Sequence, residues 1–156
     1  MKLWLKILLC VIAISVSGAA GAIWTGSSLK DWYALLEKPP GVPPGWIFGP
    51  VWTILYLMMG VSLALFWHEA ESGPEKRTAL IWFFGQLVLN LAWTPVFFGM
   101  HQIGVALLVI AVLLVTILIT LILFRRGHKP AGRLLIPYAI WVGYATYLNA
   151  GYWVLN

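Results

Sequence analysis

Charged residues are scarce in this chain of 156 residues, which has ten Lys and Arg, five Asp and Glu, and a charged fraction of 10%. Soluble domains usually carry about 25% charged residues, so these are too few to cover a water-exposed surface. The apolar fraction is 62%. The composition therefore predicts a membrane protein. The net charge of +5 does not point to nucleic acid, because no continuous basic face exists.

The chain has a single cysteine and none of the usual catalytic sequence motifs. Cys10 is the only cysteine, which rules out an internal disulfide and a cysteine-based metal site. No Ser-His-Asp set, metal-ligand spacing or phosphate-binding loop occurs. His68, His101 and His128 lie at the ends of apolar segments or between them, where a single histidine is usually solvated. We expect no metal, no obligatory cofactor and no conventional catalytic site.

Five continuous apolar stretches are present instead, at 3–24, 47–67, 78–98, 103–124 and 134–155. At about 1.5 Å rise per residue, each is long enough to cross a hydrocarbon layer of ~30 Å. Their continuity favours helices over strands, and the connectors leave no room for a soluble domain. The sequence predicts an all-α integral membrane protein, with one five-helix transmembrane domain over residues 1–156. The interiors of these stretches carry no charged residue, so they lack the ionisable side chains that an ion-coupled pump requires.

The first stretch has a second interpretation. Lys2 and Lys6, the apolar run and the small residues 18–22 are also typical of a secretory signal with a cleavage site. However, Ala13, Ser17 and Gly21 place a small residue at every fourth position, a pattern that lets membrane helices approach closely. This spacing favours a retained helix packed inside the bundle.

The basic residues predict the orientation of five spans. One side would carry Lys2, Lys6, Lys76, Arg77, Arg125, Arg126, Lys129 and Arg133, and the other only Lys30 and Lys38. Lys and Arg are enriched in cytoplasmic loops. We therefore expect a multi-pass protein, of a bacterial cell membrane, with its N-terminus inside and its first loop and C-terminus outside.

The first connector, residues 25–46, is the only long one. Leu29, Trp32, Tyr33 and Leu36 give it an amphipathic turn or two, and the proline-rich segment 39–45 then fixes an extended path. Long ordered loops are usually functional. We interpret this connector as a structured lid across the mouth of the bundle.

Aromatic and amide side chains recur at helical spacing on three of the predicted helices, and the chain has ten tryptophans in all. The three sets are Trp52 with Tyr56; Gln86, Asn90, Trp93 and Phe97; and Tyr138, Trp141, Ala145 and Leu148 with Asn149. Such stripes predict an aromatic-lined interior suited to a large, flat, conjugated ligand. Asn90 has two interpretations of equal weight, an interhelical hydrogen bond or a ligand contact.

Four motifs occur in order along the chain. They are Trp32-Tyr33-x3-Glu37-Lys38-Pro39 with Pro43-Pro44; Trp46-x-Phe48-Gly49-Pro50-x-Trp52-Thr53-x-Leu55-Tyr56; Gln86-Leu87-x-Leu89-Asn90-x-x-Trp93-x-Pro95-x-Phe97-Phe98-Gly99; and Pro137-Tyr138-x-x-Trp141-x4-Thr146-x-Leu148-Asn149. Together they resemble the tryptophan-rich sensory protein family, also called the translocator protein or peripheral benzodiazepine receptor family. The resemblance covers nearly the whole chain.

This resemblance implies a five-helix bundle, often a homodimer, whose pocket beneath the first loop binds porphyrins such as protoporphyrin or haem. Carried over by position, the pocket would include Tyr33, Pro43, Trp52, Asn90, Trp141 and Ala145. The stripes add Tyr56, Trp93, Phe97 and Tyr138 as ligand-binding candidates. Some bacterial members are reported to degrade protoporphyrin in light. The oxidisable Trp52 and Trp141 would be the candidates for such chemistry here.

Two positions depart from the family pattern. Gly41 stands where an aromatic residue is common between the Lys-Pro and Pro-Pro pairs, and it should loosen the lid. On the third helix Gly85 is followed four residues later by Leu89, so the small-residue spacing for a family-type dimer is incomplete. We expect a receptor or carrier for porphyrins with a regulatory or stress-sensing role. The alternatives are a light- and oxygen-dependent porphyrin-degrading activity and a structural, partner-regulating membrane protein.

Overall fold

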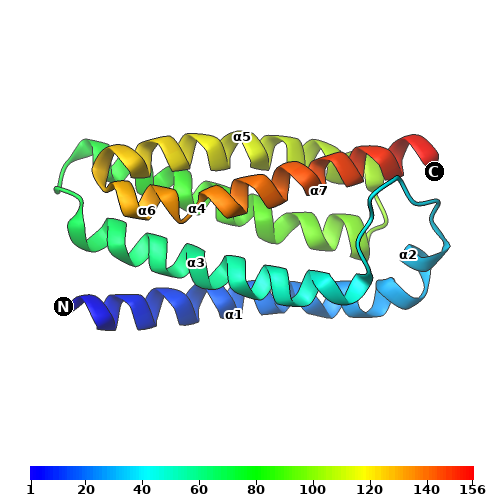
Figure 1. Ribbon diagram of the computed structural model, residues 1–156, viewed down its shortest axis with the longest axis horizontal. Coiled ribbons are helices and arrows are strands. Elements are labelled where there is room, and N and C mark those ends of the chain that lie inside the picture. Colours follow the sequence, from blue (N-terminus) through cyan, green and yellow to red (C-terminus); the bar gives the residue numbers. More distant parts are fainter.

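The computed structural model describes residues 1–156 and contains helices but no strands (Figure 1). The elements are α1 (Leu3–Lys30), α2 (Trp32–Leu35), the 3-10 turn η1 (Gly45–Ile47), α3 (Phe48–Glu69), α4 (Pro74–Thr94), the π-helical turn η2 (Pro95–Gly99), α5 (Ile103–Gly127), α6 (Lys129–Arg133) and α7 (Ile136–Leu155). Four stretches are long and apolar enough to cross a membrane: Leu3–Lys30, Gly45–Glu69, Pro74–Gly99 and Ile103–Gly127. The prediction of an all-helical protein with several membrane-spanning helices is confirmed.

The predicted boundaries of the first and fifth apolar stretches need correction, and α4 begins at Pro74 and α5 ends at Gly127, four and three residues beyond the predicted ends. The first helix does not end at Trp24 but continues to Lys30. Two hydroxyl groups near its C-terminal end bond to carbonyls of the same helix: Thr25 Oγ1 donates to Gly21 and Ser27 Oγ donates to Ile23. These polar side chains therefore do not end the helix. Leu29 therefore belongs to α1 rather than to the lid. The second correction is at the fifth apolar stretch, where α7 begins at Ile136 after the short helix α6.

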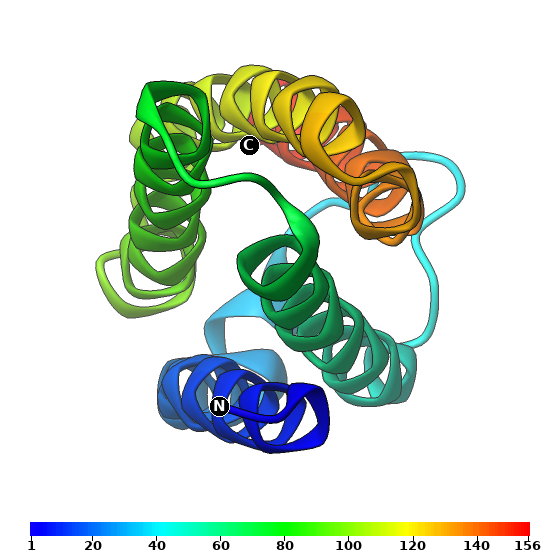
Figure 2. The same ribbon diagram turned by 90° about the vertical axis from the view of Figure 1, so that its left-hand side faces the viewer.

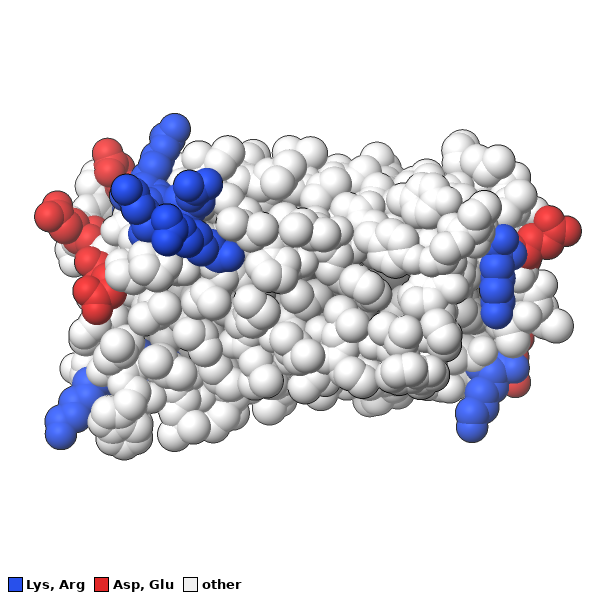
Figure 3. Space-filling view, viewed as in Figure 1, with Lys and Arg blue, Asp and Glu red and all other residues white.

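The long helices lie side by side, and the two termini lie at opposite ends of the molecule (Figures 1 and 2). Helix α1 packs on α3, while α5 contacts both α4 and α7. The charged side chains gather at the two ends and leave the middle uncharged (Figure 3). Large apolar side chains such as Val88 and Leu108, each 66% exposed, cover that middle zone. This distribution is the one a bilayer requires.

The half of the bundle nearer the N-terminus is tightly packed. Phe124 of α5 stacks on Phe66 of α3 at a centroid distance of 4.0 Å and on Phe83 of α4 at 5.4 Å. All three rings are essentially inaccessible to solvent. Because stacked rings fill this half of the bundle, the space for a ligand lies in the other half, beneath the lid.

Candidate ligand pocket

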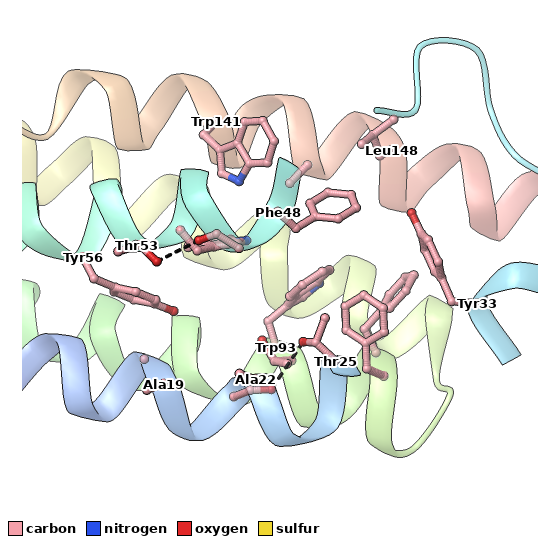
Figure 4. A pocket seen from close by; sticks show the side chains of 18 of the residues that line it. Ala19, Ala22, Thr25, Tyr33, Phe48, Thr53, Tyr56, Trp93, Trp141 and Leu148 are labelled. Atoms are coloured by element: carbon pink, nitrogen blue, oxygen red, sulfur yellow. Dashed lines mark hydrogen bonds between the residues drawn. The ribbon is translucent and has the colours of Figure 1, made fainter. Parts of the chain in front are cut away.

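A cavity of about 460 Å³ lies between the helices at the lid end of the bundle (Figure 4). Small-molecule sites usually have volumes of about 300–1,000 Å³. The lining residues are Ser15, Gly18, Ala19, Gly21, Ala22, Thr25, Tyr33, Phe48, Gly49, Trp52, Thr53, Tyr56, Trp93, Thr94, Phe97, Phe98, Trp141, Ala145, Leu148, Asn149 and Tyr152. They come from α1, the lid, α3, the α4–η2 segment and α7, so the site depends on the tertiary fold.

Aromatic pairs form the walls of the cavity. Trp52 stacks on Tyr56, with ring centroids 5.5 Å apart and an interplanar angle of 29°. Trp93 stacks in the same way on Phe97, at 5.1 Å and 24°. Neighbouring rings hold one another in fixed orientations and present flat apolar faces. The cavity therefore suits a planar, polarisable molecule.

Trp141 brings an unused hydrogen-bond donor to the cavity. Its indole Nε1 is buried and has no partner. In Figure 4 the Trp141 ring projects from α7 with its nitrogen directed toward the cavity. Trp93 differs, because its Nε1 donates to Asn149 Oδ1 at 3.0 Å. Buried donors are rarely left unpaired, so the Trp141 N–H is available to an acceptor on a ligand.

The small residues of α1 were predicted as a helix-packing face, and the structure gives them a second role. A side-chain carbon on Gly18 would lie 2.3 Å from the Tyr56 ring, so glycine is required for this contact between α1 and α3. Ala19, the next residue, and Ala22, about one turn further along α1, then line the cavity. The small-residue spacing was the sequence signal for this wall, but spacing alone does not distinguish helix packing from a cavity.

Asn90 lies behind the cavity wall rather than on it. Its Oδ1 accepts a hydrogen bond of 2.8 Å from the Tyr56 hydroxyl, and its Nδ2 donates one of 2.8 Å to the Tyr138 hydroxyl. Tyr138 in turn donates to Gln86 Oε1 at 2.6 Å. These bonds join α3, α4 and α7. Because Tyr56 does line the cavity, the network fixes the orientation of a wall residue.

The lid is fastened to α7. Tyr147 Oη donates to the Pro40 carbonyl at 2.9 Å, and the Tyr144 hydroxyl donates to the Gly41 carbonyl. Gly41 has φ +86°, a left-handed backbone conformation that favours glycine. At the C-terminus, the Glu37 N–H donates to Asn156 Oδ1 at 2.9 Å. Gly41 therefore forms a turn whose carbonyl is bound to α7.

Two aromatic contacts complete the lid. Tyr33 accepts a hydrogen bond of 2.7 Å from the Tyr152 hydroxyl. Burial raises the pKa of Tyr33 well above its usual range, so its hydroxyl stays protonated at neutral pH. Trp32 stacks on His101 of the α4–α5 connection, with centroids 4.2 Å apart. His101 is exposed, as predicted, but it also packs against the lid.

The cavity brings together most of the residues that the sequence singled out. Those on its wall are Tyr33, Trp52, Tyr56, Trp93, Phe97, Trp141 and Ala145. Three candidates do not line it. Asn90 and Tyr138 are nearly inaccessible because they are bonded to each other behind the wall. Pro43 is absent from the wall and follows the part of the lid that is bound to α7.

The fold and the cavity together define an all-helical membrane protein with an aromatic-lined internal pocket. The sequence pattern of the TspO/MBR family matches residues 7–154. The chain is 40% identical to the tryptophan-rich protein TspO of Chlorobaculum tepidum, over 93% of this chain and 92% of that protein. It is 36% identical to the protein of the same name from Archaeoglobus fulgidus, over 97% of each, and 35% identical to the human translocator protein, over 96% of this chain and 89% of that one. This chain belongs to the TspO/MBR family.

Proposed function

We propose that this protein is a membrane receptor or carrier that binds porphyrins in the cavity beneath the lid. The observation that carries the proposal is the combination of three indole side chains, those of Trp52, Trp93 and Trp141, around one cavity of about 460 Å³. A porphyrin ring is flat and conjugated, so it can stack on these faces. The free Trp141 N–H supplies one directional contact to a polar atom of the ligand.

The lining residues also specify how a porphyrin would be held. None of them is Lys or Arg, so the ring carboxylates must remain at the lid end of the cavity, near water, since burying an unpaired charge is costly. Lys30 ends α1 and Lys38 follows α2 in the lid, so both lie where they can attract those carboxylates. None of the lining residues is His, Cys or Met, and the lining tyrosines, which can also bind haem iron, have hydroxyls bonded within the protein, Tyr56 to Asn90 and Tyr152 to Tyr33. Recognition would therefore depend on the macrocycle rather than on iron.

Absorbance titration of the purified protein in lipid nanodiscs tests this proposal. Protoporphyrin should bind saturably with one site per chain and a shifted Soret band. Haem should bind with an affinity within about tenfold of that value, because no strong iron ligand adds to its binding. A porphyrin spectrum that changes identically in empty nanodiscs would refute the proposal.

We further propose that α7 is the fifth span, within one domain that has its N-terminus inside. Figure 1 shows α7 running beside α5 for most of its length. Eight basic residues lie toward the N-terminal end of the bundle and two toward the lid end, in line with the positive-inside rule. In a variant lacking Cys10, single cysteines at Lys30 and Arg126 should react with an impermeant thiol reagent from opposite sides of a bacterial cell membrane. Labelling of both from one side would contradict this topology.

A light-dependent reaction is the second candidate function, and the position of two tryptophans favours it. Trp52 and Trp141 both line the cavity, so they would be close to an excited porphyrin and to oxygen that reaches it. Bound protoporphyrin should then be consumed slowly in light and air. Replacing both tryptophans with Phe should slow the loss while keeping an apolar ring at each position. Equal loss in the dark, or in the double variant, would exclude a chemical role for these indoles.

A further inference from the structure

The cavity has an opening between α1 and α3. Four of its lining residues are exposed, Ala19 and Ala22 on α1 and Gly49 and Thr53 on α3. Figure 4 shows Ala19 and Ala22 on α1 across the cavity from Thr53 on α3. All four side chains are small. Together they border a gap that leads from the side of the bundle into the aromatic interior.

The contacts of the glycines show how this gap arises. In the packed half, a side-chain carbon on Gly60 of α3 would lie 2.6 Å from the Val11 Cα, so the two backbones touch. At Gly18 a side-chain carbon would lie 2.3 Å from the Tyr56 ring of α3. Toward the lid, Gly26 of α1 and Gly49 of α3 have no such neighbour within 4 Å. Both glycines are also exposed, so no side chain of the opposite helix covers them on this side of the bundle.

The opening lies at a depth that lipid tails would occupy. Ala22 precedes Lys30 by eight residues, which places it about 12 Å below the lid end of α1 at 1.5 Å per residue. Exposed apolar side chains flank it, with Ile23 76% and Val16 66% exposed. In a bilayer, this part of α1 would face hydrocarbon rather than water.

The other route, from water through the lid end of the cavity, is blocked by the contacts of the lid. Tyr147 and Asn156 hold the lid to α7 through hydrogen bonds to Pro40 and Glu37. Trp32 holds it to the α4–α5 connection by stacking on His101. Opening the lid would break these contacts, whereas passage between α1 and α3 would break none of them.

We propose that ligands enter the cavity sideways from the membrane, between α1 and α3, in the half of the bilayer nearer the lid. The proposal builds on the proposed function, and it makes the physiological ligand a molecule dissolved in the membrane. Ala19, Ala22, Gly49 and Thr53 form the lateral mouth. Their small side chains keep the path open, and the fastened lid closes the aqueous end of the cavity.

Stopped-flow quenching of tryptophan fluorescence by protoporphyrin, in nanodiscs, tests the lateral mouth through Ala22→Phe. A bulky ring at Ala22 should slow association and dissociation in parallel, each by ~10-fold, because it narrows the path for both directions. The affinity should therefore change little. Ala20→Phe is the matched control, since Ala20 is an exposed neighbour that does not line the cavity. It should show wild-type rates.

A lid variant supplies the opposing test. Tyr147→Phe removes the hydrogen bond to Pro40 and should leave both rates unchanged. Wild-type rates in Ala22→Phe, or faster association in Tyr147→Phe, would overturn the lateral route. A loss of affinity in Ala22→Phe with unchanged association would overturn it too, because it would make Ala22 only a contact residue. Absence of saturable binding in the wild-type protein would instead refute the proposed function itself.

Discussion

Replacing Trp141 with alanine should weaken protoporphyrin binding by on the order of tenfold or more. The change removes one flat wall of the cavity and the indole N–H that has no partner within the protein. Stacking of a conjugated ring on one aromatic side chain contributes about 1–3 kcal/mol, which corresponds to this loss. The dissociation constant from an absorbance titration measures the effect.

Two variants separate the contributions of Trp141. Trp141→Phe keeps an aromatic wall but lacks the N–H, so its affinity should lie between those of the wild type and the alanine variant. Trp4→Ala is the control, because Trp4 is 61% exposed and does not line the cavity. It should bind as the wild type does. Wild-type affinity in Trp141→Ala would show that this indole only packs against its neighbours.

Replacing Asn90 with leucine should lower stability by about 1–3 kcal/mol, the usual cost of leaving buried polar groups unpaired. The Tyr56 hydroxyl would lose its acceptor and the Tyr138 hydroxyl would lose a donor. Thermal unfolding in detergent should therefore occur at a lower temperature. Porphyrin affinity should fall less than in Trp141→Ala, because Asn90 acts on the cavity only through the orientation of Tyr56.

A double variant distinguishes this network from simple packing. In Asn90→Leu, adding Tyr56→Phe removes the hydroxyl that has no acceptor. The double variant should therefore be less destabilised than the sum of the two single variants. Strictly additive losses would contradict the network, since independent packing defects add.

Much of this architecture could be predicted because the bilayer allows few alternatives. The continuous apolar stretches had to be helices, and the aromatic and amide stripes that include Trp52 and Trp141 predicted which helix faces line the interior. Helix ends were harder to predict. Ser27 and Ser28 looked like the start of a loop, but their hydroxyls bond to backbone carbonyls, one in α1 and one at Phe98, so α1 continues.

The sequence did not distinguish a wall residue from a residue behind it. Asn90 and Trp93 share a helical stripe, yet only Trp93 reaches the cavity, because the Asn90 amide is bound by tyrosines from α3 and α7. The bond between Gly41 and Tyr144 of α7 could not be predicted either, since the two residues are about a hundred residues apart in the chain. Such contacts depend on how the helices are placed and leave no local signal.

Titration of intrinsic tryptophan fluorescence with protoporphyrin in nanodiscs tests the central claim most directly, because three tryptophans line the cavity. We expect saturable quenching with one porphyrin per chain, at a midpoint that moves to higher concentration in Trp141→Ala and not in Trp4→Ala. Quenching that rises without saturation, or that is identical in the wild type and Trp141→Ala, would contradict a porphyrin site in this cavity.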